Sequence, residues 1–543
     1  MDNDNLDSNP KKGDKSKKSS KFEKEKRPDK NLEPKKGSSL GLVFWTAASI
    51  IIAAALVATI IPGKFEAASS SVYGWIAGLF SWFFMIAVFG FALFLIFLAL
   101  SPYGRIKLGG DNSKPEFSFR SWIGMLFSGG LGVGLVFFGV AEPMSHYMIS
   151  PFPGGETETV EAARMAMGYS FFHWGISQWS IFGVAGLAIG YNQYRKKKDG
   201  LVSTSLEPIL GNDYNQKLRK SIDILAVVAT VTGMATSVGL GIMQMDGGLN
   251  IAYGIPSGPL TQIILTALMT GFFILSTTTG LKRGIKWLSN LNMLLAAVIT
   301  IFIMAVGPFT FIMESIVVGL GDYLSNYVGY SLRMQPYTGE VWVQEWTVFY
   351  WAWVIAWSPF IGSFVARISK GRSIREYVMG ILIIPPILSF LWIGALGGTA
   401  IYSDLFNGTN IGALVLEDDT AALFALFDQL PLTELFSALA ILLIFTFLVT
   451  SADSATFIVA GMTSGNTDAP STRLKVIWGV LLGFLTVTLI IAGGLTSLQA
   501  ASLLAGLPFG LVLIAMIIAV SKSLRREPND SMKRRQRKDR TRA

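Results

Sequence analysis

The stretch YWAWVIAWSPF, Tyr350–Phe360, places five aromatic residues and a proline inside a long apolar run. Pro359 has no backbone N–H, and its ring clashes with the carbonyl of Ile355, one turn earlier in a helix. A helix that crosses a membrane here is therefore predicted to kink or unwind, with the small residues Ser358 and Gly362 beside the break. Two questions follow: why a span carries so much aromatic surface, and what the interruption is for.

The composition is that of a membrane protein. Of the 543 residues, 51% are hydrophobic and 15% are charged, and the mean hydropathy is +0.49, whereas soluble globular proteins are about 25% charged. Long apolar runs recur from Leu40 to Leu524, separated by short polar segments. These features predict an all-α polytopic membrane protein. The absence of cysteine excludes disulfides and thiolate metal sites, and a total of two histidines disfavours a multi-histidine metal centre.

Twelve spans account for the apolar runs, and each is long enough to cross a hydrocarbon core of about 30 Å. They are expected at about residues 40–62, 72–100, 121–149, 162–191, 222–245, 258–280, 285–309, 345–367, 378–402, 434–462, 473–494 and 497–521. Lys and Arg gather in the loops that follow spans two, four, eight and ten, and the alternate loops contain few of them. By the positive-inside rule, this alternation places both termini in the cytoplasm of a multi-pass protein of the cell membrane.

The two ends and one internal segment are expected to lie outside the membrane-spanning domain, residues 39–524. Residues 1–38 mix Lys and acidic residues with Ser, Gly and Pro, which predicts a disordered, basic cytoplasmic tail. Residues 525–543 form a second basic cytoplasmic tail, which favours contact with anionic membrane lipid over nucleic acid because no nucleic-acid-reading module accompanies the charge. Residues 311–330 interrupt apolar positions with polar ones and are expected to form an amphipathic helix on the outer face.

Glycine is concentrated in span three, in the stretch FSGGLGVGLVFFG, residues 127–139. Glycine lets membrane helices pack closely, but it also weakens a helix, so that backbone amides and carbonyls can face a cavity. Both interpretations stay open. Spans three and eight are five apart, and transporters with inverted repeats interrupt a helix at corresponding places in each half. The pattern predicts one repeat over about 121–309 and a second over about 345–521, preceded by two further spans.

Aromatic residues cluster near the middle of spans four and eight. With about 100° between successive residues, Tyr350, Trp353 and Trp357 share one face of span eight, whereas Trp351 points away. The aromatic belts at membrane interfaces do not explain rings at mid-span. These rings indicate either an aromatic core or a dry site for a cation without hydrogen-bond donors, such as a quaternary ammonium, worth about 2 kcal/mol per contact. A carboxylate on the same ligand would find backbone amides in the glycine-rich part of span three.

Four motifs resemble those of one family, the betaine/choline/carnitine transporters. They are GGLGVGLVFFGVAEP in span three, FHWGISQW in span four, YWAWVIAWSPFIGSFVARISKGRSIREY from span eight into the next loop, and TSADSAT in span ten. The resemblance extends from about Leu40 to about Leu524. It implies a LeuT-like fold of five-plus-five inverted repeats preceded by two helices, a homotrimer, and transport of trimethylammonium compounds and related osmolytes.

The resemblance also implies a substrate site in which an ammonium group lies in a box of aromatic rings. In this sequence the substrate-binding residues would be Trp174, Trp179 and Phe182 of span four, Trp353, Val354 and Trp357 of span eight, and Phe137, Gly130, Gly132 and Gly134 of span three. Phe182 stands where betaine carriers usually have a tyrosine, and Val354 stands where the family usually has a tryptophan that walls the box. These two departures bear on which osmolyte is carried.

Sodium ligands are a further implication of the resemblance. They would be two hydroxyls of span ten and three backbone carbonyls, namely the hydroxyls of Thr450 and Ser451 and the carbonyls of Ser128, Leu131 and Phe447. A hard cation needs such oxygen ligands. Taken alone, the two hydroxyls could equally bond back into their own helix. Phe360, with Thr230 or a nearby hydroxyl of span five, would mark a second sodium site.

The residues and the resemblance together predict a secondary active importer, a sodium symporter of glycine betaine or a related zwitterionic or cationic osmolyte for osmoprotection. Proton-coupled choline carriers have an aspartate where Gly134 stands, so this glycine favours sodium coupling. Choline, carnitine, ectoine and proline remain alternative substrates. No cofactor other than the coupling ion is expected.

An enzyme buried in the membrane is a remote alternative, because His173 has no evident Asp/Ser arrangement for catalysis. Two acids at membrane depth, Glu142 and Asp453, are candidates for function by their position. Glu142 lies next to Pro143 near the outer end of span three, and Asp453 lies between serines. Both settings favour structural pairing over a direct role.

Overall fold

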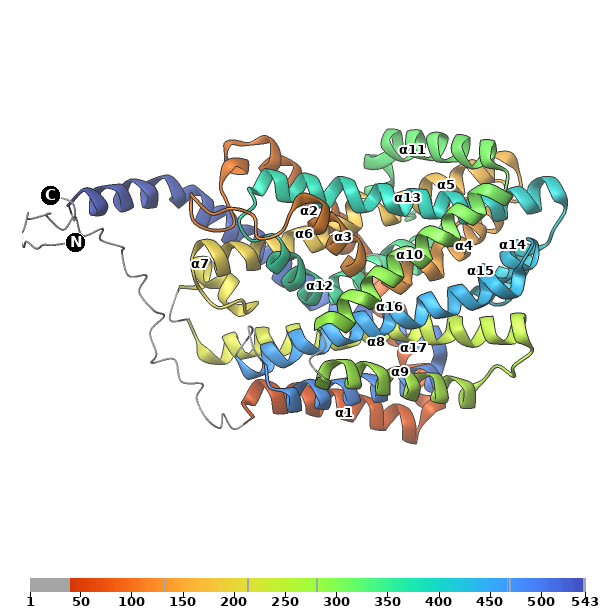
Figure 1. Cartoon of the computed structure of the whole chain (residues 1–543), viewed down its shortest axis with the longest axis horizontal. Coiled ribbons are helices and arrows are strands. Elements are labelled where there is room, and N and C mark those ends of the chain that lie inside the picture. Colours follow the sequence, from red (N-terminus) through yellow and green to blue (C-terminus); the bar gives the residue numbers. More distant parts are fainter. Residues whose placement is uncertain are drawn as a thin grey trace, which may run out of the picture. The chain divides into compact units, whose positions relative to one another are not determined.

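The structure is a computed structural model that describes residues 40–540, with the exception of 131, 212–213, 280–281, 466 and 468–469. Within these residues the chain folds into helices joined by turns and loops, and the only extended pairing is an isolated bridge between Lys107 and Ser373 (Figure 1). The predicted all-α protein is confirmed for this part of the chain. Residues 1–38, predicted as a disordered tail, lie outside the described residues.

Seventeen α-helices and five shorter helical turns follow one another along the described part of the chain. The α-helices are α1 (Leu42–Ile60), α2 (Pro62–Leu100), α3 (Phe119–Gly130), α4 (Gly132–Met148), α5 (Val160–Trp174), α6 (Ile176–Gly190), α7 (Glu207–Leu210), α8 (Gln216–Tyr253), α9 (Pro259–Thr279), α10 (Lys282–Val306), α11 (Phe309–Ser331), α12 (Phe349–Ile368), α13 (Ile374–Asn407), α14 (Ile411–Glu417), α15 (Ala422–Asp428), α16 (Thr433–Ser464) and α17 (Thr472–Arg540). The turns are η1 (Pro102–Arg105), η2 (Tyr191–Arg195), η3 (Ser203–Leu206), η4 (Gln344–Val348) and η5 (Asp419–Ala421).

Nine stretches of the described helices are long and apolar enough to cross a membrane. They are Leu42–Ile60, Pro62–Leu100, Gln216–Tyr253, Pro259–Thr278, Trp287–Val306, Gln344–Ile368, Ile374–Asn407, Thr433–Ser464 and Thr472–Glu527. These stretches confirm a multi-pass membrane protein. Predicted spans three and four are not among the nine, because each is formed by two helices of fewer than 18 residues, α3 with α4 and α5 with α6. Helix α11 occupies the segment predicted as an amphipathic outer helix, and its place on the outer face stays a prediction.

Helix α17 covers two predicted spans. Its apolar part, Thr472–Glu527, has 56 residues, or about 84 Å at 1.5 Å per residue, far more than a core of about 30 Å. The backbone leaves the helical region at Gly493 (φ 177°, ψ 21°) and Gly494 (φ 53°, ψ −134°). A glycine without a Cβ adopts the positive φ at Gly494 at little cost. The chain can reverse direction here, between the spans predicted at 473–494 and 497–521. The total of twelve spans and the inverted repeats stay predictions.

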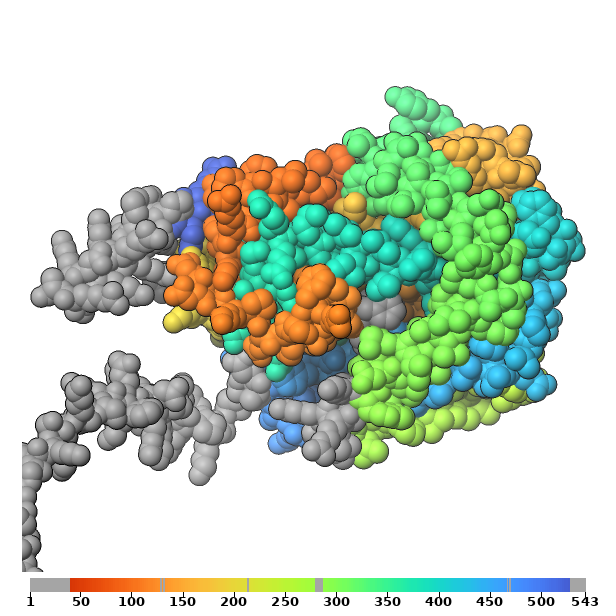
Figure 2. All heavy atoms as spheres, turned by 45° about the horizontal axis from the view of Figure 1, so that its top comes forward, coloured from red at the N-terminus to blue at the C-terminus, as the bar shows by residue number. Residues whose placement is uncertain are grey.

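Loops that are predicted to share the cytoplasmic side are in contact with one another. After α2 and after α12, the N–H of Gly371 donates to the carbonyl of Leu108 over 2.7 Å, and the N–H of Leu108 donates to the carbonyl of Arg372 over 2.8 Å. These segments lie side by side in Figure 2, in orange and teal. At the end of η2, Arg195 Nε donates to Glu527 Oε1 of α17 over 2.7 Å. Arg195 Nη1 also donates to the carbonyl of Gly109 over 2.9 Å. The ends of predicted spans two, four, eight and twelve are therefore in contact with one another, as the alternation of loops requires.

Helix α12 is continuous from Phe349 to Ile368, although Pro359 lies inside it. Of the two outcomes predicted for this proline, the continuous helix excludes an unwound turn, and the kink stays a prediction. The carbonyl of Ile355, which has lost its N–H partner, accepts the hydroxyl of Ser358 at 2.7 Å. A side chain next to the proline thus satisfies the freed carbonyl. In a lipid environment no water is available to take that role.

Small residues let α12 approach its neighbours closely. A Cβ added to Gly362 would lie 2.5 Å from Cβ of Ala185 in α6. On the other side, a Cβ added to Gly233 of α8 would lie 2.8 Å from the backbone nitrogen of Trp357. The backbone of α12 is therefore in direct contact with α6 and α8, which sets the position of its aromatic side chains relative to both.

We expect Gly362→Ala to destabilise the protein, because the new methyl group would overlap Ala185 where no flexible side chain can give way. Overpacking of this kind costs about 1–3 kcal/mol, so the midpoint of thermal unfolding in detergent should fall. Gly271→Ala in α9 is the matched control, because nothing lies within 4 Å of a Cβ added there. Equal midpoints for the two variants would contradict the close contact between α6 and α12.

Candidate functional site

Helices α4, α5 and α12 bring three predicted tryptophans together above the glycines of span three. A Cβ added to Gly134 would lie 2.3 Å from Cη2 of Trp353 and 3.2 Å from Cη2 of Trp174. A Cβ added to Gly132 would lie 3.9 Å from Cη2 of Trp357. All three indoles are buried, with at most 5% of their surface exposed. Glycine is required at 134 because any side chain there would occupy the space of the rings.

Two further predicted rings extend this group. The centroids of Trp353 and Trp357 are 6.1 Å apart with nearly parallel planes, at 9°. Phe182 lies 5.6 Å from Trp357 and 5.6 Å from Trp179, in edge-to-face contacts. We call Trp174, Trp179, Phe182, Trp353 and Trp357 the aromatic cluster. Its rings come from α5, α6 and α12 and face the interior of the protein, because none of them is more than 5% exposed.

Phe138 joins the aromatic cluster, although the sequence interpretation named its neighbour Phe137. The ring of Phe138 lies 6.3 Å from that of Trp353, whereas Phe137 is buried against Phe138, at 4.7 Å between centroids. One signal could have indicated Phe138. It follows Gly134 by one helical turn and so lies on the same face of α4 as the glycine that the rings cover.

The indole N–H groups of the aromatic cluster fall into two pairs. Trp174 Nε1 donates to Glu142 Oε2 at 2.7 Å, and Trp353 Nε1 donates to a serine hydroxyl of α8 at 3.2 Å. Nε1 of Trp179 and Nε1 of Trp357 have no hydrogen-bond partner among the described residues, although these side chains are only 0% and 5% exposed. A buried donor without an acceptor costs about 1–3 kcal/mol. The aromatic cluster therefore contains two donors that an acceptor on a ligand would satisfy.

A break in span four, which the sequence interpretation missed, lies beside the aromatic cluster. Helix α5 ends at Trp174, Gly175 has φ −91° and ψ −146°, and α6 begins at Ile176. The N–H of Ile176 donates to the hydroxyl of Tyr323 in α11 at 2.9 Å. A Cβ at Gly175 would lie 2.6 Å from that hydroxyl, so the glycine makes room for the tyrosine. Only the glycine of the HWG sequence signalled this break, because its partner lies 147 residues further along the chain.

The predicted sodium hydroxyls lie next to the aromatic cluster. Ser451 Oγ is 3.9 Å from the position of a Cβ on Gly132, the glycine that Trp357 covers. The hydroxyl of Thr450 donates to the carbonyl of Phe447 in its own helix at 3.0 Å. This bond is the alternative that remained open for these hydroxyls from the sequence. Two of the predicted ligands, Thr450 and Phe447, thus bond to each other in this structure.

A cavity of about 560 Å³ leads to these hydroxyls. It is lined by Thr450, Ser451 and Phe360, and it extends to Arg120 and Ser121, which are exposed. The structure therefore brings Phe360, predicted for a second sodium site, to the same space as the first. The cavity gives the candidate ion site a connection to the surface.

The remaining predicted site residues are not joined to this space by described contacts. Thr230 lines a separate, much smaller cavity, and its hydroxyl donates to a carbonyl of its own helix. Val354 is buried in α12, and Gly130 is the last residue of α3. Leu131 lies outside the described residues, as does the side chain of Ser128. The binding roles of these five residues stay predictions.

Comparison with known proteins identifies the family. A model of the betaine/carnitine/choline family transporters (BCCT) matches residues 42–529. The chain belongs to the BCCT family. It is 50% identical over 482 residues to the ectoine/hydroxyectoine transporter of Virgibacillus pantothenticus, covering 89% of this chain and 96% of that protein. It is 44% identical over 493 residues to the glycine betaine transporter OpuD of Bacillus subtilis strain 168, covering 90% and 96%. The high-affinity choline transport protein of Escherichia coli K12 is 36% identical over 492 residues, covering 90% and 72%.

Membership of the BCCT family makes this protein a transporter and not an enzyme. The family that the four motifs indicated is confirmed, over residues 42–529. The aromatic cluster of this BCCT transporter lies where the motifs of spans three, four and eight meet. The site residues therefore come from the parts of the sequence that carry the family resemblance.

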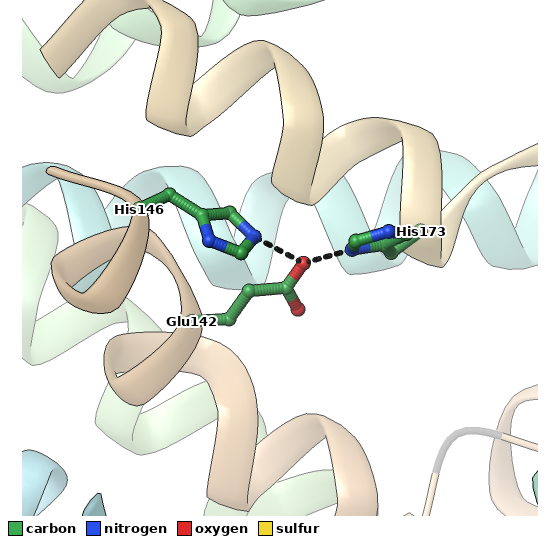
Figure 3. Close-up of side chains that lie close together, drawn as sticks. All are labelled: Glu142, His146 and His173. Atoms are coloured by element: carbon green, nitrogen blue, oxygen red, sulfur yellow. Dashed lines mark hydrogen bonds and ion pairs between the residues drawn. The ribbon is translucent and has the colours of Figure 1, made fainter. Parts of the chain in front are cut away.

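A polar group of three side chains lies beside Trp174. Glu142 Oε1 is 2.6 Å from His173 Nδ1 and 3.3 Å from His146 Nε2, and all three residues are wholly buried (Figure 3). Their ligand-type atoms lie within 4.8 Å of one another, but an O–N distance of 2.6 Å is that of a hydrogen bond. The group is therefore a hydrogen-bonded node. The other membrane acid, Asp453, bonds to two hydroxyls of α9.

We expect Gly134→Ala to lower substrate uptake by at least about tenfold, because overpacking costs about 1–3 kcal/mol and the new methyl group would displace the rings of Trp353 and Trp174. Initial uptake rates in proteoliposomes measure the effect. Gly398→Ala in α13 is the control, because nothing lies within 4 Å of a Cβ added there. Similar rates for both variants would show that the rings do not depend on the glycine at 134.

Proposed function

We propose that this protein imports glycine betaine, or a closely related quaternary-ammonium compatible solute, by sodium symport, and that it serves osmoprotection. The observation that carries the proposal is the aromatic cluster, five buried rings of which three lie over Gly132 and Gly134. The faces of such rings attract a cation that has no hydrogen-bond donors, at about 2 kcal/mol or more per desolvated contact. A trimethylammonium group meets this description.

The unpaired indoles favour a ligand that also carries an acceptor. Nε1 of Trp179 and Nε1 of Trp357 lie in the aromatic cluster without a partner among the described residues. A carboxylate would accept from either, and hydrogen bonds to a charged group are worth about 1.5–3 kcal/mol. The pairing of π faces with free donors supports a zwitterion, such as glycine betaine, over a simple cation.

Sodium coupling is supported by the position of the predicted hydroxyls. Ser451 lies beside Gly132, which Trp357 covers, so an ion there would be close to the substrate. Thr450 and Ser451 offer oxygen atoms of the kind that a hard cation prefers. If the ion and the substrate bind the same closed form, each raises the affinity of the protein for the other. This is the thermodynamic condition for coupling.

The cavity supports transport by alternating access. In this structure it opens on the face of the protein where the basic loops lie. Phe117, which lines the cavity, accepts a hydrogen bond from Arg372 of the loop after α12 at 3.0 Å. From this face the cavity leads to Thr450 and Ser451. We assign this face to the cytoplasm on the positive-inside rule, which also places both termini there. A homotrimer and contact of the basic tail with anionic lipid complete the proposal.

Ectoine is the second candidate substrate. Val354 stands where the family usually has a tryptophan wall of the box, and a valine is the smaller side chain. The relative with 50% identity is an ectoine/hydroxyectoine transporter. Ectoine is also a zwitterion with a carboxylate, so the two free indole donors suit it equally.

Uptake of labelled glycine betaine into proteoliposomes tests the proposal. An inward sodium gradient should drive accumulation, and an equal potassium gradient should not. Unlabelled ectoine, choline, carnitine and proline, added as competitors, rank the substrates. An unchanged rate in potassium would refute sodium symport, and stronger competition by ectoine than by unlabelled betaine would make ectoine the substrate.

We expect Trp357→Phe to raise the KM for glycine betaine by about tenfold, because it removes a donor to the carboxylate that is worth about 1.5–3 kcal/mol and keeps an aromatic ring. Tetramethylammonium has no acceptor, so its inhibition constant should stay the same as in the wild type. Trp351→Phe is the control, because the ring of Trp351 packs on Phe172 and His173, neither of which belongs to the aromatic cluster. A parallel loss for both ligands would mean that the ring, and not its N–H, makes the contact.

A further inference from the structure

Glu142 of α4 accepts hydrogen bonds from four side chains in the protein interior. Its Oε2 accepts the indole N–H of Trp174 at 2.7 Å and the hydroxyl of Tyr350 at 2.6 Å. Its Oε1 faces Nδ1 of His173 at 2.6 Å and Nε2 of His146 at 3.3 Å, as Figure 3 shows. The side chain has no exposed surface, so these four contacts take the place of its hydration.

This arrangement suits a carboxylate better than a neutral side chain. A carboxylate has two acceptor oxygens and no proton, so both sides can receive donors. His173 also lies 2.9 Å from the hydroxyl of Thr347 through Nε2, and a neutral imidazole with its proton on Nδ1 satisfies both contacts. A glutamine at 142 would turn an NH₂ group toward Trp174 and Tyr350 or toward the histidines, and so set donor against donor on one side.

The indole of Trp174 extends from Glu142 to Gly134, one of the two glycines of α4 that the aromatic cluster covers. Nε1 is held by Glu142, while Cη2 lies 3.2 Å from the position of a Cβ on Gly134. The backbone helix ends at Trp174 itself, and Gly175 departs from helical geometry. The side-chain hydrogen bond therefore fixes a ring at the end of a helix, where the following turn gives no support.

The same carboxylate oxygen ties Trp174 to α12. Tyr350 meets the indole edge-to-face, at 5.7 Å between centroids, and lies on the face of α12 that carries Trp353 and Trp357. Three helices of the site, α4, α5 and α12, are thus joined at Glu142. We propose that Glu142 is a positioning residue for substrate binding, which holds the rings of spans four and eight in register before the substrate arrives.

The inference rests on the proposed function, in which Trp174 contacts the substrate. Preorganisation lowers the cost of ordering the site on binding, so its loss should appear in KM. A residue that served only to hold the fold together would instead change the amount of folded protein, and hence the maximal rate. This difference makes the role of Glu142 measurable.

The test is a double-mutant cycle on glycine betaine uptake in proteoliposomes, with initial rates normalised to the amount of reconstituted protein. Glu142→Gln should raise KM by at least about tenfold, because it removes hydrogen bonds to a charged group, and should change the maximal rate by less than about twofold. Trp174→Phe keeps a ring and removes the N–H, and it should raise KM as well. The double variant should stay within about twofold of the weaker-binding single variant, because residues in one hydrogen-bond network are not additive.

A pair of tyrosine variants serves as the matched control and decides the matter if Glu142→Gln does not reach the membrane. Tyr350→Phe removes one donor to Glu142 and should raise KM by about threefold or more. Tyr377→Phe removes the single hydrogen bond of another wholly buried tyrosine, to the carbonyl of Gly183 at 3.0 Å, and should leave KM unchanged.

Three results would overturn the inference: a wild-type KM in Glu142→Gln, single-variant effects that multiply in the double variant, or equal KM values in the two tyrosine variants. Failure of the proposed function looks different. In that case the wild-type protein itself takes up neither glycine betaine nor any of the competitors.

Discussion

Inside a lipid bilayer no water is available to pair a buried polar group, and this constraint governs both the helices and the candidate site. Where Pro359 deprives Ile355 of its partner, Ser358 supplies a hydroxyl and the helix continues. Where span four breaks, the N–H of Ile176 finds the hydroxyl of Tyr323. In each case a side chain takes the place of the missing partner.

Against this background, two indoles of the aromatic cluster stand out as donors that a ligand could pair. Trp174 and Trp353 both have acceptors, one from α4 and one from α8. Trp179 and Trp357 lie in the same cluster and have none among the described residues. An acceptor brought by a zwitterionic substrate would pair these two donors, which is part of the proposed function.

Helical periodicity was sufficient to predict which rings of span eight share a face. Trp353 and Trp357 are one turn apart, and they stack in the structure. The interruptions were harder to predict because their outcome depends on partners elsewhere. The proline rule predicts a kink or an unwound turn in α12, but it takes no account of a neighbouring hydroxyl that bonds the freed carbonyl while the helix continues. A lone glycine at 175 gives no hint of the tyrosine, 147 residues away, that caps the real break.

Polar residues in the spans were equally ambiguous for the same reason. The hydroxyl of Thr450 can bind an ion or its own helix, and only the folded structure shows the second. Three of the four partners of Glu142 come from positions 31, 32 and 208 residues away, and only His146 is close in sequence. The sequence favoured structural pairing for this carboxylate, and the fold surrounds it with four donors that the sequence did not identify.

The hydrogen bonds divide the candidate site into a part that is held together and a part that is open. Glu142 joins α4, α5 and α12, and Gly362 packs α12 directly on α6, so these helices form one connected body. The cavity instead lies between this body and the hydroxyls of α16. In the proposed transport cycle, a rocking movement closes the cavity. It would carry Gly132 and Gly134 toward Thr450 and Ser451 without breaking the hydrogen bonds at Glu142. Sodium bound at that boundary would favour the closed form, which is the differential affinity that coupling requires.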